Sequence, residues 1–291
     1  MKGLEDTSVK KPISDNPIPP EGISLVDTHC HLDMREFEND FDMVLNRAKN
    51  HGVESVITIG IDLASSRKAI ELARKYQCIR ASVGIHPHDV HSATDETYAA
   101  IEDLIETNYG RVVGYGEIGL DYLKKRSEPE LQRRHFRRQL EIAKKHRLPV
   151  IIHDRDAHED TLRILHETGP YPNGGVMHCF SGDMDFADKI VNLGFHVSIP
   201  GIVTFKNAHD LHEVAQKVPL TSLLVETDGP FLAPHPWRGK RNEPAYILYT
   251  AEYIAKLRDI PLVELAKATT ANAKSLFQLN ASQPPAYSPH L

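Results

Sequence analysis

Leu25-Val-Asp-Thr-His-Cys-His31 is an apolar, strand-like run that ends in metal-ligand side chains, and four similar runs follow it. Because the carboxyl ends of parallel strands share one rim, side chains at this position converge even when they lie far apart in sequence. The pattern therefore predicts a single cavity of the kind found in metallohydrolases. The other four runs are Gly114-Tyr-Gly-Glu117, Val150-Ile-Ile-His153, Val176-Met-His178 and Leu223-Leu-Val-Glu-Thr-Asp228.

Short apolar runs alternate with longer segments in which apolar residues recur at helical spacing, as in Phe41, Val44, Leu45 and Ala48. The runs are continuously apolar, which is typical of strands covered by helices on both faces. Eight β–α units in 291 residues predict an α/β fold, a (β/α)₈ TIM barrel. An open doubly wound sheet is the alternative, and the lack of a glycine-rich nucleotide fingerprint disfavours it. The expected strands are Ile23–Asp27, Val53–Ile59, Ile79–Gly84, Arg111–Gly116, Leu148–His153, Gly174–His178, Gly194–Ile199 and Thr221–Thr227.

Both ends of the chain differ from this pattern. Residues 1–22 contain four prolines and no apolar signal segment, and residues 280–291 contain three prolines. We therefore expect a flexible N-terminal extension over 1–22, a single barrel domain over 23–279 and a flexible C-terminal tail over 280–291.

Composition limits the setting in which the protein works. The net charge of −6 gives no global attraction to nucleic acid or membrane. Three cysteines, Cys30, Cys78 and Cys179, are too few for a disulfide framework, so we expect a reducing, cytoplasmic environment. No apolar run approaches the roughly 18 residues that span a bilayer, so no membrane contact is expected. The oligomeric state stays open.

His29 and His31 lie two residues apart just after the first expected strand. Residues i and i+2 of extended backbone point to the same face, so both imidazoles can reach one ion. Taken alone, such a pair is also typical of solvated loop histidines. Asp27 is expected either to hydrogen-bond a histidine ring N–H and fix its tautomer or to cap the strand.

Glu117 follows the fourth expected strand, and its two carboxylate oxygens can bridge a pair of ions about 3.5–4 Å apart. A surface glutamate is the alternative, but the flanking glycines Gly114, Gly116 and Gly119 permit close approach of the backbone to bound groups. Asp121 and Tyr122, which come next, are interpreted as supporting residues.

His153 and His178 each end an apolar run on successive strands, which makes them neighbours on the rim. Asp228 ends the eighth run, and the eighth strand of a closed barrel lies beside the first. Asp228 can therefore ligate the ion held by His29 and His31, and it can also accept a proton from an attacking water.

Five stretches closely resemble the motifs of the TatD family of metal-dependent deoxyribonucleases, in the same order. The resemblance covers about residues 23–279 and implies a TIM-barrel, amidohydrolase-like fold. It implies that His29, His31 and Asp228 hold one divalent ion, that His153 and His178 hold a second, and that Glu117 bridges them. The stretches are Asp27-Thr-His-Cys-His-Leu-Asp33, Gly116-Glu-Ile-Gly-Leu-Asp-Tyr122, Ile151-Ile-His-Asp-Arg-Asp-Ala157, Met177-His-Cys-Phe-Ser-Gly182 and Glu226-Thr-Asp-Gly-Pro-Phe231.

The resulting hypothesis is hydrolysis of a DNA phosphodiester, on a single-stranded or damaged substrate, by water activated by two ions of Mg²⁺, Mn²⁺ or Zn²⁺. Asp228 and Glu117 are the expected catalytic groups. The expected substrate-binding residues are His86, Arg155, Arg238, Lys240 and Arg241. Phe180 and Phe231 either stack on a base or pack in the core.

Two other functions stay open at the level of sequence. The same metal pair serves an amidohydrolase or esterase, including an aminoacyl-tRNA deacylase. Glu117, rather than a lysine, after the fourth strand favours the phosphodiesterase. A binding protein with a vestigial site is the other alternative, and six intact ligands argue against it.

Overall fold

The computed structural model describes residue 19, residues 21–124 and residues 126–279. Most of the predicted N-terminal extension and the whole predicted C-terminal tail lie outside these residues, so both remain predictions.

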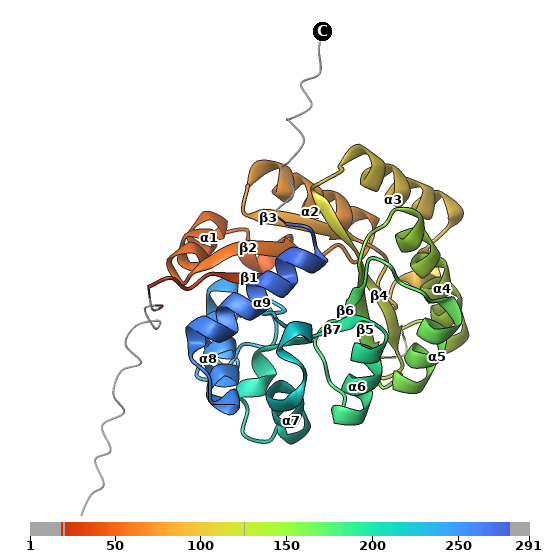
Figure 1. The fold of residues 1–291 in the computed structure, drawn as a ribbon. Coiled ribbons are helices and arrows are strands. Elements are labelled where there is room, and N and C mark those ends of the chain that lie inside the picture. Colours follow the sequence, from red (N-terminus) through yellow and green to blue (C-terminus); the bar gives the residue numbers. More distant parts are fainter. Residues whose placement is uncertain (1–18, 20, 125, 280–291) are drawn as a thin grey trace, which may run out of the picture.

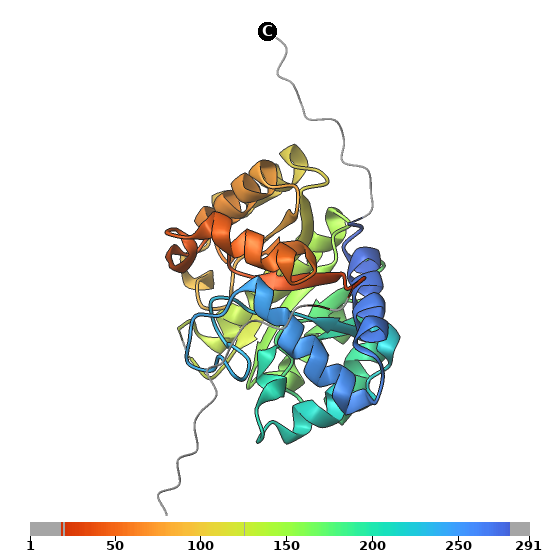
Figure 2. The same cartoon turned by 90° about the vertical axis from the view of Figure 1, so that its left-hand side faces the viewer.

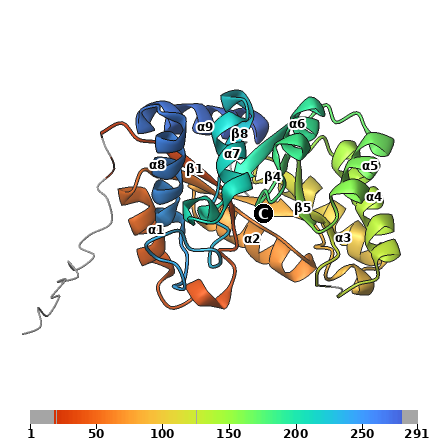
Figure 3. The same cartoon turned by 90° about the horizontal axis from the view of Figure 1, so that it is seen from below.

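Eight parallel strands form one sheet in which each strand pairs with the next along the chain, in the order β1 to β8. The helices surround the strands, as Figures 1 and 3 show, which confirms the predicted (β/α)₈ TIM barrel. The strands are β1 Leu25–Cys30, β2 Val53–Thr58, β3 Ile79–Val83, β4 Val112–Asp121, β5 Val150–Arg155, β6 Gly175–Met177, β7 Phe195–Ile199 and β8 Leu223–Val225.

The helices begin at recognisable signals in the sequence. Asp62 and Thr94 accept hydrogen bonds from the backbone N–H groups three residues further on, and Pro129 occupies the first position of α4. The α-helices are α1 Phe41–Asn50, α2 Leu63–Lys75, α3 Asp95–Thr107, α4 Pro129–Lys145, α5 His158–Thr168, α6 Met184–Asn192, α7 His209–Lys217, α8 Ile247–Arg258 and α9 Leu262–Leu276. Short 3₁₀ helices span Arg35–Phe37, Val90–Ser92, Gly201–Thr204, Leu220–Ser222 and Pro244–Tyr246.

The barrel closes where β8 meets β1. Cys30 and Gly229 form a parallel bridge, and the Asp228 N–H donates to the His29 carbonyl at 2.8 Å. The Asp27 carboxylate adds a cross-link by accepting from the backbone N–H and the hydroxyl of Thr227 at 2.9 and 2.6 Å. The segments that carry His29, His31 and Asp228 are therefore joined directly.

The amino-terminal end of the barrel is covered by α9. Its residues Leu276 and Phe277 pack with apolar side chains inside the barrel, including Ile151 and Val176. Asn272 donates to the carbonyls of residues 220 and 223, just before and at the start of β8. Figure 2 shows α8 and α9, in blue, beside the red first strand. One end of the barrel is thus filled with apolar side chains, which leaves the carboxyl end for polar groups.

Three strands run at least two residues beyond their expected ends, so those ends were wrong. β1 continues to Cys30 rather than ending at residue 27, β4 continues to Asp121 rather than ending at residue 116, and β5 continues to Arg155 rather than ending at residue 153. His29 and Glu117 consequently lie within strands rather than after them. No helix in the described part of the chain is long and apolar enough to cross a membrane.

Candidate metal centre

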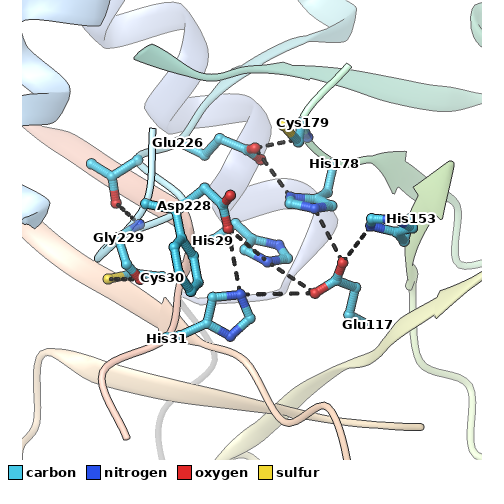
Figure 4. A network of polar contacts seen from close by, with 12 residues as sticks. His29, Cys30, His31, Glu117, His153, His178, Cys179, Glu226, Asp228 and Gly229 are labelled. Carbon is cyan, nitrogen blue, oxygen red and sulfur yellow. Dashed lines mark hydrogen bonds and ion pairs between the residues drawn. The ribbon is translucent and has the colours of Figure 1, made fainter. Parts of the chain in front are cut away.

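Four side chains form the first half of the site: His29 in β1, His31 just after it, Glu117 in β4 and Asp228 in the turn after β8 (Figure 4). His29 Nε2 lies 3.4 Å from Glu117 Oε2, and His31 Nε2 lies 3.4 Å from Asp228 Oδ1. The remaining cross-distances are 3.7 Å from His29 Nε2 to Asp228 Oδ1 and 3.9 Å from His31 Nε2 to Glu117 Oε2. Two imidazoles and two carboxylates therefore face one small volume.

The other oxygen of Glu117 faces a second group of side chains. Oε1 lies 2.7 Å from His153 Nδ1, 3.2 Å from His178 Nε2 and 3.3 Å from His86 Nε2. One carboxylate thus contacts both halves of the site through different oxygens, as a bridging ligand must. The structure brings all six sequence-predicted ligands together, with His86 beside them.

Strand alternation explains why these histidines point into the barrel mouth. Ile151 in β5 and Val176 in β6 pack inside the barrel, and His153 and His178 follow each of them by two residues. Side chains two apart on a strand share a face, so each histidine lies above an inward apolar residue.

The glycines of β4 let this strand approach β5 closely. Gly116 and Gly119 have φ angles of +153° and +141°, a region that side-chain-bearing residues rarely adopt. A Cβ at Gly116 would lie 2.3 Å from the Ile151 carbonyl oxygen, and one at Gly119 would lie 2.0 Å from that of His153. The glycines on either side of Glu117 thus let β4 lie close to β5, which brings Glu117 to the centre of the site.

Opposite charges hold Glu117 ionised although it is buried. Burial alone would raise the pKa of this carboxyl, but the charges of His178 and His86 and hydrogen bonds from His153 and His178 hold it well below its usual value. The carboxylate is therefore available as a ligand over the whole physiological pH range.

The histidines divide into two electrostatic classes. Burial lowers the pKa of His29 to about 3 and that of His86 to about 4. Burial acts in the same direction on His153, but hydrogen bonds with Asp121 and Glu117 outweigh it and raise the pKa to about 9. A metal ion must displace such protons, so metal binding should weaken as the pH falls.

The donor set fits divalent metal ions. Both ring nitrogens of His29 and Nδ1 of His31 are buried and have no hydrogen-bond partner in the described structure, a costly arrangement unless a ligand satisfies them. Mixed imidazole and carboxylate donors suit Zn²⁺ and Mn²⁺. Three groups place their ligand atoms within 4.8 Å of one another: His29, His31 and Glu117; His86, Glu117 and His153; and His29, His178 and Glu226.

Comparison with known proteins agrees with this geometry. The family model of TatD related DNase matches residues 26–278. The chain belongs to the TatD family. It is 44% identical over 256 residues to the uncharacterized metal-dependent hydrolase YabD of Bacillus subtilis (strain 168), covering 88% of this chain and 100% of YabD. It is 40% identical over 264 residues to the uncharacterized metal-dependent hydrolase YcfH of Escherichia coli (strain K12), covering 89% of this chain and 97% of YcfH.

Solved structures point to the same family. The crystal structure of YjjV, a TatD homologue from Escherichia coli K12, superposes with a TM-score of 0.84 at 33% identity, covering 87% of this chain and 98% of YjjV. This TatD-family protein is therefore a metal-dependent hydrolase built on a TIM barrel.

Glu226 is a buried acid of this TatD-family site that the sequence analysis did not single out. Its Oε1 accepts hydrogen bonds from His178 Nδ1 at 3.1 Å and from the Cys179 backbone N–H at 2.7 Å. The carboxylate thereby orients the ring whose Nε2 faces Glu117. The signal was present, because Glu226 follows the inward Leu224 by two residues, just as His178 follows Val176.

The expected roles of the two aspartates near the ligands had different outcomes. Of the two roles open to Asp27, the structure does not show the hydrogen bond to a histidine ring: its carboxylate accepts from the His29 backbone N–H and from Thr227. Asp121 contacts a predicted ligand: its Oδ2 lies 3.3 Å from His153 Nε2 and 2.7 Å from His88 Nε2.

The cations that were expected to bind substrate differ in whether they form ion pairs within the protein. Arg155, Arg238 and Lys240 are exposed and form no ion pair within the described residues, although the Arg238 guanidinium lies 4.6 Å from the ring centroid of Phe205. Arg241 instead donates to both carboxylate oxygens of Asp40, at 2.7 Å each. The charge of Arg241 is already engaged within the protein.

The two phenylalanines that follow predicted ligands also differ. Phe180 is buried, and its ring stacks on Phe186 with 5.5 Å between centroids, so it packs in the core. Phe231 is 47% exposed, and its ring centroid lies 6.0 Å from that of His31. Of these two phenylalanines, Phe231 is the one whose ring is exposed at this rim.

Proposed function

We propose that this TatD-family hydrolase cleaves phosphodiester bonds of DNA with two divalent metal ions. The observation that carries the proposal is the position of Glu117, whose two oxygens each face a separate group of histidines. In this proposal His29, His31 and Asp228 hold one ion, His153 and His178 hold the other, and Glu117 binds both.

When bound, a metal pair of this kind lowers the pKa of a coordinated water to about 7 and neutralises negative charge on a phosphoryl oxygen. The proposed ions are Mg²⁺, Mn²⁺ or Zn²⁺. Glu117 would fix the spacing of the pair, because its carboxylate is fully enclosed by histidines.

Asp228 is the proposed general base. Its side chain is 13% exposed whereas that of Glu117 is 4% exposed, so Asp228 is the carboxylate that solvent water reaches more easily. It would orient the attacking water and accept its proton.

His86 and the free cations are the proposed substrate contacts. His86 Nε2 already lies at the Glu117 carboxylate, where a scissile phosphate would enter, and its side chain is 11% exposed. Arg155, Arg238 and Lys240 would bind flanking phosphates, where guanidinium and ammonium groups give charge-assisted hydrogen bonds. Arg241 is a weaker candidate, since it must first leave Asp40.

The test is hydrolysis of end-labelled oligonucleotides by the full chain after chelation and reloading with Mg²⁺, Mn²⁺ or Zn²⁺. Products are resolved by mass, beside generic ester and amide substrates and an aminoacyl-tRNA. The proposal expects metal-dependent nucleotide release that is lost in Asp228→Asn and in His153→Ala. Arg137→Ala, on the outer face of α4, is the matched control and should cleave at the normal rate.

Turnover of the ester, amide or aminoacyl-tRNA with DNA left intact would replace the proposal with the alternative hydrolase activities. Oligonucleotide binding without turnover of any substrate would indicate a binding protein.

A further inference from the structure

Five large apolar or aromatic side chains are exposed in the described part of the chain: Met43, Tyr109, Leu123, Phe231 and Val263. Of these, Phe231 is the only aromatic residue that follows a strand at the carboxyl end of the barrel, since Tyr109 precedes β4. Its contact with the His31 ring distinguishes Phe231 from the other four, because it places an exposed aromatic ring beside the site.

The backbone beneath this ring is firmly held. The Phe231 N–H donates to the Asp228 carbonyl at 2.8 Å. The side-chain amide of Asn242, which is fully buried, donates to the carbonyls of both Phe231 and Thr227 at 2.7 Å. The exposed ring is therefore presented from a fixed position rather than from a loosely held loop.

The ring lies directly beside the proposed site of phosphodiester cleavage. It approaches the His31 imidazole edge to face, and His31 Nε2 lies 3.4 Å from Asp228 Oδ1. A nucleotide whose phosphate occupies the site would have its base within reach of this ring. The Phe231 side chain has no hydrogen-bond donor or acceptor. It can therefore contact a base only through its aromatic ring.

We propose that Phe231 is the stacking platform for the base next to the scissile phosphate. The proposal rests on the phosphodiesterase function proposed above. Stacking on a phenyl ring tolerates every base, because each has a π-face. A base inside a duplex is already stacked and paired, so it must first be released.

The experiment compares two single-stranded oligonucleotides of equal length, one intact and one with an abasic residue at each end, which makes the cleavage polarity irrelevant. The wild-type protein, Phe231→Ala, Phe231→Tyr and the remote control Val263→Ala are assayed with Mn²⁺. Phe231→Ala should lower kcat/KM on the intact strand by roughly 5- to 100-fold and should leave the abasic strand unchanged. Phe231→Tyr should restore the rate, and Val263→Ala should match the wild type on both strands.

An equal loss on both strands would overturn the proposal, because it would mean that Phe231 only shapes the site. No loss on either strand would overturn it as well. If the wild type cleaves neither strand, the proposed phosphodiesterase function fails. The role of Phe231 is then tested by measuring the affinity for fluorescent strands in Ca²⁺. Stacking predicts that the wild type binds the intact strand more tightly than the abasic strand and that Phe231→Ala loses this difference, whereas equal wild-type affinities would reject the role.

Discussion

Two acid–histidine pairs of this barrel, one fully buried and one with a partly exposed histidine, occupy different places. Glu226 lies 3.1 Å from His178 Nδ1 at the rim, and Asp154 lies 2.6 Å from His158 Nδ1 between β5 and α5. The other nitrogen of His178 faces Glu117, whereas the ring of His158 stacks on Phe186. The same chemical pair therefore orients a proposed metal ligand in one place and joins a helix to a strand in the other.

The difference extends to the charged groups around each pair. At the rim, Arg155 and Arg238 have no ion-pair partner among the described residues. On the outer face of α4, Arg137 pairs with Glu167 at 2.5 Å and Arg133 pairs with Asp160 at 2.8 Å. In the proposed function the cations without an ion-pair partner bind the substrate, whereas the paired cations stabilise the fold, so mutation should separate the two regions.

The largest expected effect comes from Glu117, on which both halves of the site converge. Glu117→Gln removes the negative charge shared by the two groups of histidines, so activity should fall by about 10²–10³-fold or more. The bound metal, measured by elemental analysis after dialysis, should fall below that of the wild type. The thermal unfolding midpoint of the chelated variant should also fall, because the carboxylate that compensates the buried, protonated His153 and His178 is lost. Full metal content in this variant would remove the basis for a bridging role.

Next in size is the contrast between the two acid–histidine pairs themselves. Glu226→Gln should weaken metal affinity or activity by about 10- to 100-fold, since the carboxylate orients His178. Asp154→Asn is the matched control, and it should keep metal affinity while losing about 1 kcal/mol of unfolding free energy. Metal titration against a chelating dye and urea denaturation measure the two effects. Equal metal affinities in the two variants would contradict the conclusion that the Glu226–His178 pair supports metal binding and the Asp154–His158 pair does not.

Sequence alone could predict the positions in which strand alternation sets the direction of a side chain. Ile151 and His153, and likewise Val176 and His178, obey this rule, and the barrel needs only eight recurring apolar runs. Glu226 obeys the same rule, since it follows the inward Leu224 by two residues. The prediction considered only the last polar residue of this run, Asp228, so it missed Glu226.

Other features depended on contacts that no local pattern contains. The continuation of β4 through Glu117 requires glycines at unusual φ angles against a neighbouring strand, and local propensity disfavours glycine in a strand. Arg241 was expected at the substrate, but its partner Asp40 lies 201 residues away in sequence. Whether a cation is free or paired is decided by such distant contacts.

A smaller effect is expected from the free cations of the rim. Arg155→Ala and Arg238→Ala should each lower kcat/KM on single-stranded DNA by about 3- to 10-fold at low salt. Each should also reduce the slope of log affinity against log salt by about 0.7, the value for one lost phosphate contact. Arg137→Ala, a paired cation, should change neither quantity. Binding titrations at several salt concentrations check this, and a shift of the slope in Arg137→Ala would contradict the separation of free from paired cations.

The smallest effect concerns the pH dependence of stability at the structural pair. The hydrogen bond with Asp154 raises the pKa of His158 above its usual value of 6.5. The folded state therefore holds this proton more tightly than the unfolded state, so the contribution to stability is complete below pH 6.5 and is lost as the pH rises through the raised pKa. Because the ring is partly exposed, the loss should be less than about 1 kcal/mol. Urea denaturation at pH 6 and pH 8.5 should show it in the wild type and not in Asp154→Asn. An identical pH dependence in both proteins would mean that this ion pair contributes nothing to the fold and that the contrast with Glu226 lies in metal binding alone.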